Sequence, residues 1–228
     1  MGAKYNCKVD PNKDPYTFYV LNSVDLSATT VNFIMDSNVR TGGEAVKEVE
    51  PTEEQKGYIE WTSTEYLKEL ISQEDLDNNK NLNVYGPVTA MEYLQEATKD
   101  WTNVSPQIVN VYIDDLGMTH KILQTFTTNA RLPYLSEVGE TGCDISGNNM
   151  QGSCPLWMID YLYNYYNYEN RKSVLYVWGY WTMSSISSDS ANAWLVNYGG
   201  SASYNTVNFS DHYGVRPVIN VPINRISQ

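Results

Sequence analysis

The stretch that decides the fold runs from residue 191 to residue 209 and reads ANAWLVNYGGSASYNTVNF. Two runs rich in β-forming residues flank Gly199 and Gly200, and a glycine pair between such runs is typical of a hairpin turn. Alternation with a period of two directs one set of side chains inward: Ala193, Leu195 and Val207. It directs a second set outward: Asn192, Trp194, Tyr198, Tyr204 and Asn208. Two asparagines on the inward parity argue against a fully regular hairpin: Asn197 and Asn205.

Further strands are expected on both sides of this hairpin. Residues 174–181 and 214–221 have β-type composition, so the C-terminal part should hold four strands. Near the N-terminus, residues 16–22 and 31–36 predict an opening hairpin, and residues 108–113 and 120–128 predict another extended pair. We therefore expect a sheet that both chain ends help to close.

Helices are expected mainly in the middle of the chain. Residues 62–65 and 89–92 both have capping-box spacing. The first box should open an amphipathic helix that ends near residue 75, and the second should open a helix with one apolar stripe: Ala90, Leu94, Ala97 and Trp101. A further helix is expected after Pro155, with Ser153 as its cap and Leu156, Ile159 and Leu162 on one face.

The acidic stretch 74–81 is only superficially similar to a calcium loop. Lys80 stands where the turn glycine is needed and Gly86 where a bidentate acid is needed, so we expect a solvated loop. Neither an internal repeat nor a linker is evident. The sequence predicts a single mixed α+β domain over residues 1–228, with a twisted antiparallel sheet and two or three helices. Within it, residues 1–120 supply strands and helices, and residues 121–228 supply the motif-bearing half.

Composition narrows the classes of partner. The formal net charge of −12 repels phosphate backbones and anionic lipids, so we expect no nucleic-acid partner. No apolar stretch approaches the length of a membrane span, and no apolar leader segment follows Met1. We expect no membrane insertion by these residues, and we expect any leader or anchor to lie outside them.

Tyrosine and tryptophan outnumber phenylalanine, with 19 Tyr and 6 Trp against 4 Phe. Both combine a flat apolar body with a polar group, which favours a hydrated recognition surface. An ordinary aromatic-rich β-protein would give the same counts.

The three cysteines form no metal pattern, because there is no Cys-x-x-Cys and neither histidine lies close to a cysteine. Cys143 and Cys154 bracket a flexible polar segment whose ends can close easily. A disulfide between them would stabilise the fold by about 2 to 3 kcal/mol and would indicate an oxidising compartment. The alternative is two free thiols in a cytosolic protein. Cys7 is left over.

Two groups of short strings carry a resemblance to known families. Arg131-Leu132-Pro133, followed by Ser136-Glu137, resembles the Arg-Leu-Pro signature of formylglycine-generating enzymes and their relatives. Residues 178–182, 184–185 and 193–194, followed by Gly214-Val215-Arg216, resemble the order of elements with which that superfamily ends. The sequence is also similar to variable proteins of diversity-generating retroelements. Both families have a C-type-lectin-like fold, so the resemblance, which covers about the last 100 residues, implies that fold.

Residues 184–213 have the composition of a diversified surface. Eighteen of these 30 positions hold Ser, Asn, Tyr, Asp or His, and no Lys, Arg or Glu occurs between Ser173 and Val215. Adenine-directed mutagenesis of Asn codons in the retroelement systems would produce a similar mixture, and the mixture also suits antibody-type binding surfaces. An ordinary polar hairpin surface is the alternative. The resemblance implies these ligand-binding residues: Ser184, Ser185, Ser187, Asp189, Asn192, Trp194, Asn197, Tyr198, Ser203, Tyr204, Asn205, Asn208, Asp211, His212 and Tyr213.

Four residues of the motif strings are expected to be structural: Arg131, Pro133, Gly214 and Arg216. The two arginines should lie in the interior and donate to backbone carbonyls or carboxylates, because the planar guanidinium offers several donors in a fixed arrangement.

Catalysis is not expected. The chain has no cysteine after Cys154, whereas formylglycine-generating enzymes need reactive cysteines in the closing region. No Gly-x-Ser-x-Gly turn is present, and His212 beside Asp211 is expected to be a solvated loop residue. The calcium-binding strings of sugar-binding C-type lectins are also missing, so we expect no metal and no cofactor.

The leading hypothesis is a non-enzymatic receptor, extracellular or on a cell surface, phage or pilus, that binds a protein or glycan on another cell or particle. The first alternative is a fixed carbohydrate-binding or adhesin module in which Trp178, Trp181 and Trp194 stack on sugar rings. The second alternative is an enzyme derived from the formylglycine-generating fold.

Overall fold

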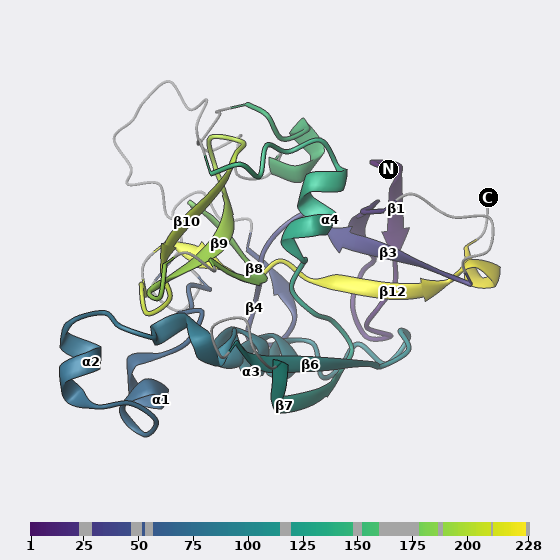
Figure 1. The fold of residues 1–228 in the computed structure, drawn as a ribbon. Coiled ribbons are helices and arrows are strands. Elements are labelled where there is room, and N and C mark those ends of the chain that lie inside the picture. The colour runs from purple at the N-terminus through teal and green to yellow at the C-terminus, as the bar shows by residue number, and fades with distance from the viewer. Residues whose placement is uncertain are drawn as a thin grey trace.

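The two ends of the chain meet in one antiparallel sheet. The computed structural model describes residues 1–22, 29–46, 52, 57–114, 120–147, 152–159, 178–186, 189–210 and 212–226. The sheet has the order β1-β2-β3-β12, with β1 (Lys4–Cys7), β2 (Tyr16–Val20), β3 (Thr30–Met35) and β12 (Val218–Pro222). The pairing of β2 with β3 confirms the predicted opening hairpin, and strands β1 and β12 lie on the same side of the molecule (Figure 1).

A second four-stranded sheet holds the hairpin predicted around Gly199 and Gly200. Its order is β10-β9-β8-β11, with β8 (Gly179–Ser185), β9 (Asn192–Asn197), β10 (Ala202–Thr206) and β11 (Tyr213–Gly214). β11 runs parallel to β8, and the other neighbours are antiparallel. Residues 174–177 of the expected strand before the hairpin lie outside the described residues.

The single strand expected over residues 214–221 is wrong, because the chain changes sheets there. β11 ends at Gly214 in the second sheet, and β12 begins at Val218 in the first. Pro217 lies between them and has no amide hydrogen to continue a ladder, although its carbonyl accepts the amide of Met35 at 2.9 Å. This crossing connects the two sheets directly.

Two smaller strand pairs complete the β-structure. The first joins β4 (Val39–Arg40) to β5 (Glu44–Ala45), and the second joins β6 (Gln107–Asp114) to β7 (His120–Thr128). The second pair confirms the extended runs expected over 108–113 and 120–128. Its register shifts between Val111 and Tyr112, as in a β-bulge.

Helices are short apart from α3. They are α1 (Thr64–Lys68), α2 (Gln73–Asp77), the 3-10 helix η2 (Leu82–Tyr85), α3 (Val88–Ala97), α4 (Leu135–Glu140) and the 3-10 helix η3 (Ile223–Arg225). Residues 156–159, just after Pro155, are also helical, as expected, whereas Leu162 lies outside the described residues. No helix in the described part of the chain is both long and apolar enough to cross a membrane.

The structure corrects the predicted helix starts. The first expected helix is divided into α1 and α2, because Ser63 and Ser72 each act as an N-cap and accept an amide hydrogen in the following turn. α2 therefore occupies part of the acidic stretch expected to be a loop. α3 starts at Val88, and its N-cap is Pro87, which has no side-chain acceptor. Thr89 lies inside the helix, and its hydroxyl accepts the amide of Ser63 at 2.8 Å. Ala90, Leu94 and Ala97 form the predicted buried stripe of α3, whereas Trp101, although also buried, lies beyond the end of the helix.

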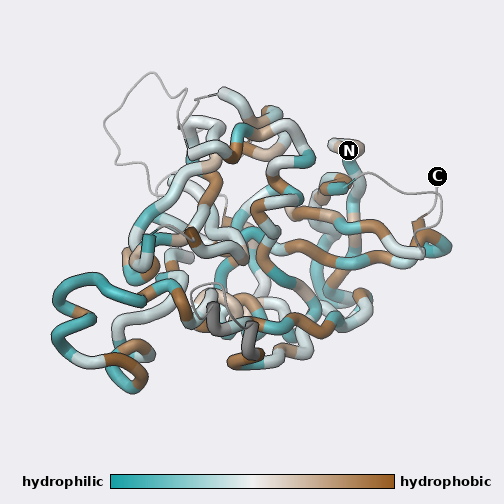
Figure 2. The backbone as a smooth tube through the Cα atoms, viewed as in Figure 1, coloured by the Kyte–Doolittle hydropathy of each residue, from teal (hydrophilic) through white to brown (hydrophobic). Residues whose placement is uncertain are grey.

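The buried hydrophobic residues form two core clusters. One large cluster joins residues of both sheets, α3 and the β6–β7 pair, and includes Trp61, Trp101 and Trp181. A smaller cluster lies against the other face of the second sheet and includes Cys143, Met158 and Val196. Figure 2 shows hydrophobic segments in the central strands and mostly hydrophilic residues where α1 and α2 project from the body. The chain is thus a mixed α+β protein in which antiparallel pairing predominates.

Candidate functional site

The candidate site begins with an aromatic pair on the β9–β10 hairpin. Trp194 and Tyr204 are directly opposite each other in the register, and their ring centroids lie 6.0 Å apart at 82°. Tyr204 is 45% exposed and belongs to the edge strand of its sheet, while Trp194 is half-buried. Asn192 lies on the same face, two residues from Trp194. These three predicted ligand-binding residues therefore form one contiguous surface.

The opposite face of the hairpin is anchored in the core. Ala193, Leu195 and Val207 are fully buried, as the alternation predicted. The outward parity is not uniformly exposed, since Val196 is also fully buried in the smaller core cluster. One end of the outward face is thus covered. At the other end Trp194 packs in part against the same cluster, and Tyr204 is exposed.

The two asparagines of inward parity satisfy their polar groups locally. Asn197 Oδ1 accepts the amide of Ser201 at 3.3 Å and its hydroxyl at 3.2 Å, which stabilises the turn between the strands. Asn205 donates from Nδ2 to the Tyr213 hydroxyl at 3.4 Å and accepts the amide of Thr206 at 2.8 Å. Both are half-buried, so they depart from the alternation without leaving an unsatisfied amide in the core.

An asparagine outside the predicted segment holds the loop that enters β9. Asn83 is buried, and its Nδ2 lies 3.1 Å from Ile186 O, 2.5 Å from Asp189 O and 2.7 Å from Asn192 O. Asp189 closes the loop from inside, because its carboxylate accepts the amide of Ala191 at 2.9 Å and the side-chain amide of Asn192 at 2.6 Å. Asn83 carries no sequence signal of this role, since it contacts residues more than 100 positions away.

Several predicted ligand-binding residues instead contribute to packing. Tyr213 is 7% exposed, with its ring 5.1 Å from Trp181, and burial raises its pKa, so it offers no free surface to a ligand. His212 stacks on Trp178 with centroids 4.1 Å apart, and Tyr198 contacts the same indole edge-on. The expectation of a solvated His212 is therefore wrong.

The remaining predicted residues are distributed around the sheet. Asn208 donates to the Thr64 hydroxyl at 3.2 Å, which ties the end of the hairpin to the start of α1. Ser203 is half-buried on the inward parity of the edge strand. Ser184 and Ser185 lie at the end of β8, away from the aromatic pair in sequence but beside the loop that Asn83 holds. Ser187 and Asp211 lie outside the described residues.

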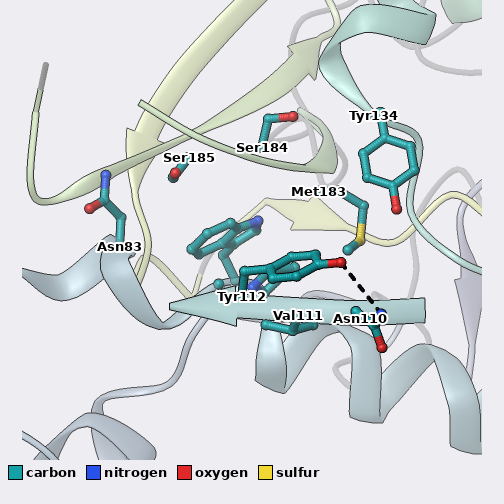
Figure 3. Close-up of a pocket in the computed structure, with 11 residues that line it drawn as sticks. Asn83, Asn110, Val111, Tyr112, Tyr134, Met183, Ser184 and Ser185 are labelled. Atoms are coloured by element: carbon teal, nitrogen blue, oxygen red, sulfur yellow. Dashed lines mark hydrogen bonds between the residues drawn. The ribbon is translucent and has the colours of Figure 1, made fainter. Parts of the chain in front are cut away.

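A pocket of about 270 Å³ opens beside Ser184 and Ser185. Its other walls come from η2, β6 and the segment before α4, which contribute Asn83, Tyr112 and Tyr134 (Figure 3). Tyr112 is 43% exposed and Tyr134 is 38% exposed, so both rings are accessible at the rim. Sequence reasoning missed all three wall residues. Only Tyr134 had a nearby signal, because it directly follows the Arg-Leu-Pro string.

The motif arginines lie in the interior, where the sequence led us to expect them. Arg131 forms a salt bridge with Glu137, and its guanidinium lies 4.7 Å from the centroid of the Tyr134 ring. Arg216 is 1% exposed and donates to the carbonyls of Met35, Trp157 and Met158.

The other two motif residues connect elements. The carbonyl of Pro133 accepts the amide of Met183 at 2.8 Å, which attaches the Arg-Leu-Pro segment to β8. A Cβ on Gly214 would lie 2.6 Å from Asn38 Nδ2 and 3.0 Å from Gly57 O, so any larger residue would force one of these groups to move. Both positions are therefore structural in this fold.

Cys143 and Cys154 form a disulfide in the structure, with their Cα atoms 4.0 Å apart. Both are buried in the smaller core cluster, where they pack with Met158 and Val196. The segment they close reaches the aromatic pair, because a Cβ on Gly147 would contact the Trp194 ring at 3.5 Å. The disulfide therefore supports one border of the candidate site.

Among the described residues, no group of three or more His, Cys, Asp or Glu side chains is arranged to hold a metal ion. Comparisons with known proteins add no relatives. No protein-family model matches the chain, and neither a curated protein nor a solved structure has a significant match to it.

Proposed function

We propose that the chain is a non-enzymatic receptor with a C-type-lectin-like fold that presents an exchangeable binding surface on the β9–β10 hairpin. The observation that carries the proposal is the division of this hairpin into two faces. Leu195 and Ala193 anchor one face in the core, while the half-buried Trp194 and the exposed Tyr204 form an aromatic pair on the other. Such an arrangement allows side chains to be exchanged on a fixed backbone.

The chemistry of the surface supports recognition of a ligand. Tyrosine and tryptophan supply contact area at a small cost in side-chain entropy, and Asn and Ser adapt their hydrogen bonds to different partners. No Lys, Arg or Glu occurs between Ser173 and Val215, so few ionised groups would have to be desolvated on binding. The mixture resembles that of retroelement variable proteins.

The scaffold and the location are supported by separate observations. Both chain ends lie in one antiparallel sheet, and the buried Arg131 and Arg216 occupy the motif positions of the resemblance. The Cys143–Cys154 disulfide favours an oxidising, extracellular location. The ligand would be a protein or glycan on another cell or particle.

A fixed carbohydrate-binding module that stacks sugars on the three tryptophans is less well supported. Trp181 is fully buried, and one face of Trp178 is covered by His212. Trp178 and Trp194 are both half-buried, and Trp194 alone of the three lies on the β9–β10 hairpin.

Two experiments test the proposal. In the DNA that encodes the chain, we expect a nearby near-copy of the segment for residues 184–213, with differences confined to adenines of the copy, and an adjacent reverse transcriptase gene. In the second experiment, labelled protein is incubated with a panel of bacterial and animal cells, and binding is measured by flow cytometry. Trp194→Ala/Tyr204→Ala should lose binding that Leu70→Ala/Ile108→Ala, a control pair of exposed apolar residues on other elements, retains. Equal binding by both double variants would contradict the proposal.

A further inference from the structure

The pocket beside Ser184 and Ser185 is formed by parts of the chain that are far apart in sequence. β8, η2, β6 and Tyr134 each contribute a wall, and Met183 lies between the two rim tyrosines, with Asn83 at the other end of the hollow (Figure 3). Its volume of about 270 Å³ is near the lower end of the range for small-molecule sites, so it suits one ring-sized group.

The pocket walls are rigid at several points. Asn83 is held by three backbone carbonyls of the loop 186–192, and Asn110 Oδ1 accepts the hydroxyl of Thr125 at 2.9 Å. The Ser184 hydroxyl oxygen accepts the amide of Leu135 at 3.2 Å. A ligand would therefore meet a largely preformed site and would lose little affinity to ordering of the protein.

The polar groups of the pocket can still donate and accept hydrogen bonds, so they suit a ligand that does both. The Ser184 hydroxyl accepts the Leu135 amide, which leaves its proton available to a ligand. Asn83 uses its Nδ2 group on carbonyls, which leaves Oδ1 as an acceptor. Ser185 adds a second hydroxyl at the same wall. Hydroxyl groups on the ligand would complement this set.

The uncharged lining and the two tyrosine rings of the pocket further restrict the class of ligand that it can bind. None of the described residues that line the pocket carries a charged side chain, and the chain as a whole has a net charge of −12. An anionic ligand would be repelled, and a cationic ligand would find no carboxylate in the walls. Tyr112 and Tyr134 present accessible rings whose negative faces attract the weakly positive C–H groups of a saturated ring.

We infer that this pocket is a subsite for one ring of a neutral carbohydrate. The inference deepens the proposed function and rests on it, since Ser184 and Ser185 belong both to the pocket and to the segment proposed to bind ligand. The sugar ring stacks on Tyr112 or Tyr134, and its hydroxyls bond to the serine hydroxyls and to Asn83. The β9–β10 hairpin then contacts whatever extends beyond that ring, so Asn83, Tyr112 and Tyr134 supply fixed contacts and the residues of the exchangeable segment supply specificity.

The test is saturation-transfer NMR with the intact chain and free sugars. The neutral probes are glucose, galactose, mannose, N-acetylglucosamine and N-acetylgalactosamine, and the charged probes are N-acetylneuraminic acid and glucuronic acid. We expect signal transfer to at least one neutral sugar and none to the charged sugars. Transfer only to a charged sugar, or to none of the probes, would overturn the inference.

Variants of the pocket residues test whether the saturation-transfer signal comes from a sugar bound in the pocket. Tyr112→Ala removes an aromatic wall and Ser185→Phe fills the pocket, so each variant should weaken sugar binding about tenfold or more. Tyr112→Phe keeps the ring and should retain most of the binding. Ile108→Ala is the matched control, because Ile108 is a 75% exposed side chain on the same strand β6 and does not line the pocket. Sugar binding that survives both pocket variants would also overturn the inference.

The hairpin variant separates this inference from the proposed function. Trp194→Ala/Tyr204→Ala should still bind the free monosaccharide while it loses binding to cells. Loss of cell binding without any neutral-sugar signal would overturn the pocket inference alone. A neutral-sugar signal at the pocket, with cell binding unchanged in the hairpin variant, would contradict the proposed exchangeable surface alone.

Discussion

Arg131 and Glu137 form a two-bond salt bridge inside the protein, with Nη1 2.7 Å from Oε2 and Nη2 2.5 Å from Oε1. Glu137 also accepts the amide of Tyr134 at 2.8 Å and the side-chain amide of Asn32 at 3.0 Å. One carboxylate therefore joins the Arg-Leu-Pro segment, the start of α4 and β3. The carboxylate side chain is only 11% exposed, so none of these partners is easily replaced by water.

Arg131→Ala should destabilise the fold by about 3 to 5 kcal/mol, because it leaves the buried carboxylate of Glu137 without its countercharge. Lys99→Ala is the control. It removes the surface Lys99–Glu96 pair, whose side chains are 57% and 60% exposed, and should lower the free energy of unfolding far less. Urea denaturation of both variants measures the difference. An equal decrease in the free energy of unfolding in both variants would contradict the prediction that the interior salt bridge contributes more to stability than the surface pair.

Removal of the disulfide should lower the free energy of unfolding by about 2 to 3 kcal/mol, because the cross-link restricts the unfolded chain. The double variant Cys143→Ser/Cys154→Ser tests this by urea denaturation, with Cys7→Ser as the control that leaves the bridge intact. A non-reduced proteolytic digest should also contain a linked Cys143–Cys154 peptide by mass. Alkylation of both cysteines without reductant would contradict the pairing.

Asn83→Ala should loosen the loop that leads into β9. Three backbone carbonyls would lose a buried amide donor, at a cost of about 1 to 3 kcal/mol. Hydrogen exchange at the amide of Ala191, which donates to Asp189, should accelerate. Asn103→Ala removes an exposed side-chain bond to the Lys8 carbonyl and should leave that exchange unchanged. Unaltered protection of Ala191 in the Asn83 variant would show that the loop does not depend on this side chain.

Substitution on the two faces of the hairpin should have unequal costs. A library at Trp194 and Tyr204, the aromatic pair of the outward face, should yield mostly soluble, folded variants, because substitutions at accessible positions usually change stability by about 0.5 kcal/mol or less. Leu195→Ala and Val207→Ala should cost about 1 to 4 kcal/mol, since both side chains are fully buried. Soluble expression and thermal denaturation measure both sets. Widespread misfolding in the library would assign the outward residues to the structure and exclude an exchangeable surface.

Cys7 should react slowly with iodoacetamide at pH 8 in the folded protein. Burial raises the pKa of its thiol to about 11, and only the thiolate attacks the reagent. The thiolate fraction should therefore be about a hundredfold smaller than for an ordinary thiol, and the rate should climb as the pH approaches 11. Mass spectrometry of samples taken over time, with urea-unfolded protein as the control, measures the rate. Equal rates in the folded and unfolded chains at pH 8 would contradict the burial of this thiol.

Local patterns in the sequence determined much of the secondary structure. The glycine pair at 199–200 and the alternation around it identified the β9–β10 hairpin and its buried side chains Leu195 and Val207. The apolar stripe of residues 90, 94, 97 and 101 identified α3, and the polar segment between the loop cysteines indicated the disulfide. These features follow from contacts between residues close in sequence, so spacing and side-chain type are sufficient to specify them.

Only the tertiary structure decided which surfaces remain accessible. Thr89 does not cap α3 because the helix begins one residue earlier, and its hydroxyl accepts the amide of the distant Ser63 instead. Tyr213 is inaccessible because it packs against Trp181 in the interior. The pocket combines Asn83 and Tyr112 with Ser185, from three elements that have no shared sequence pattern. A periodic pattern gives the face on which a side chain lies, whereas long-range packing determines what covers that face.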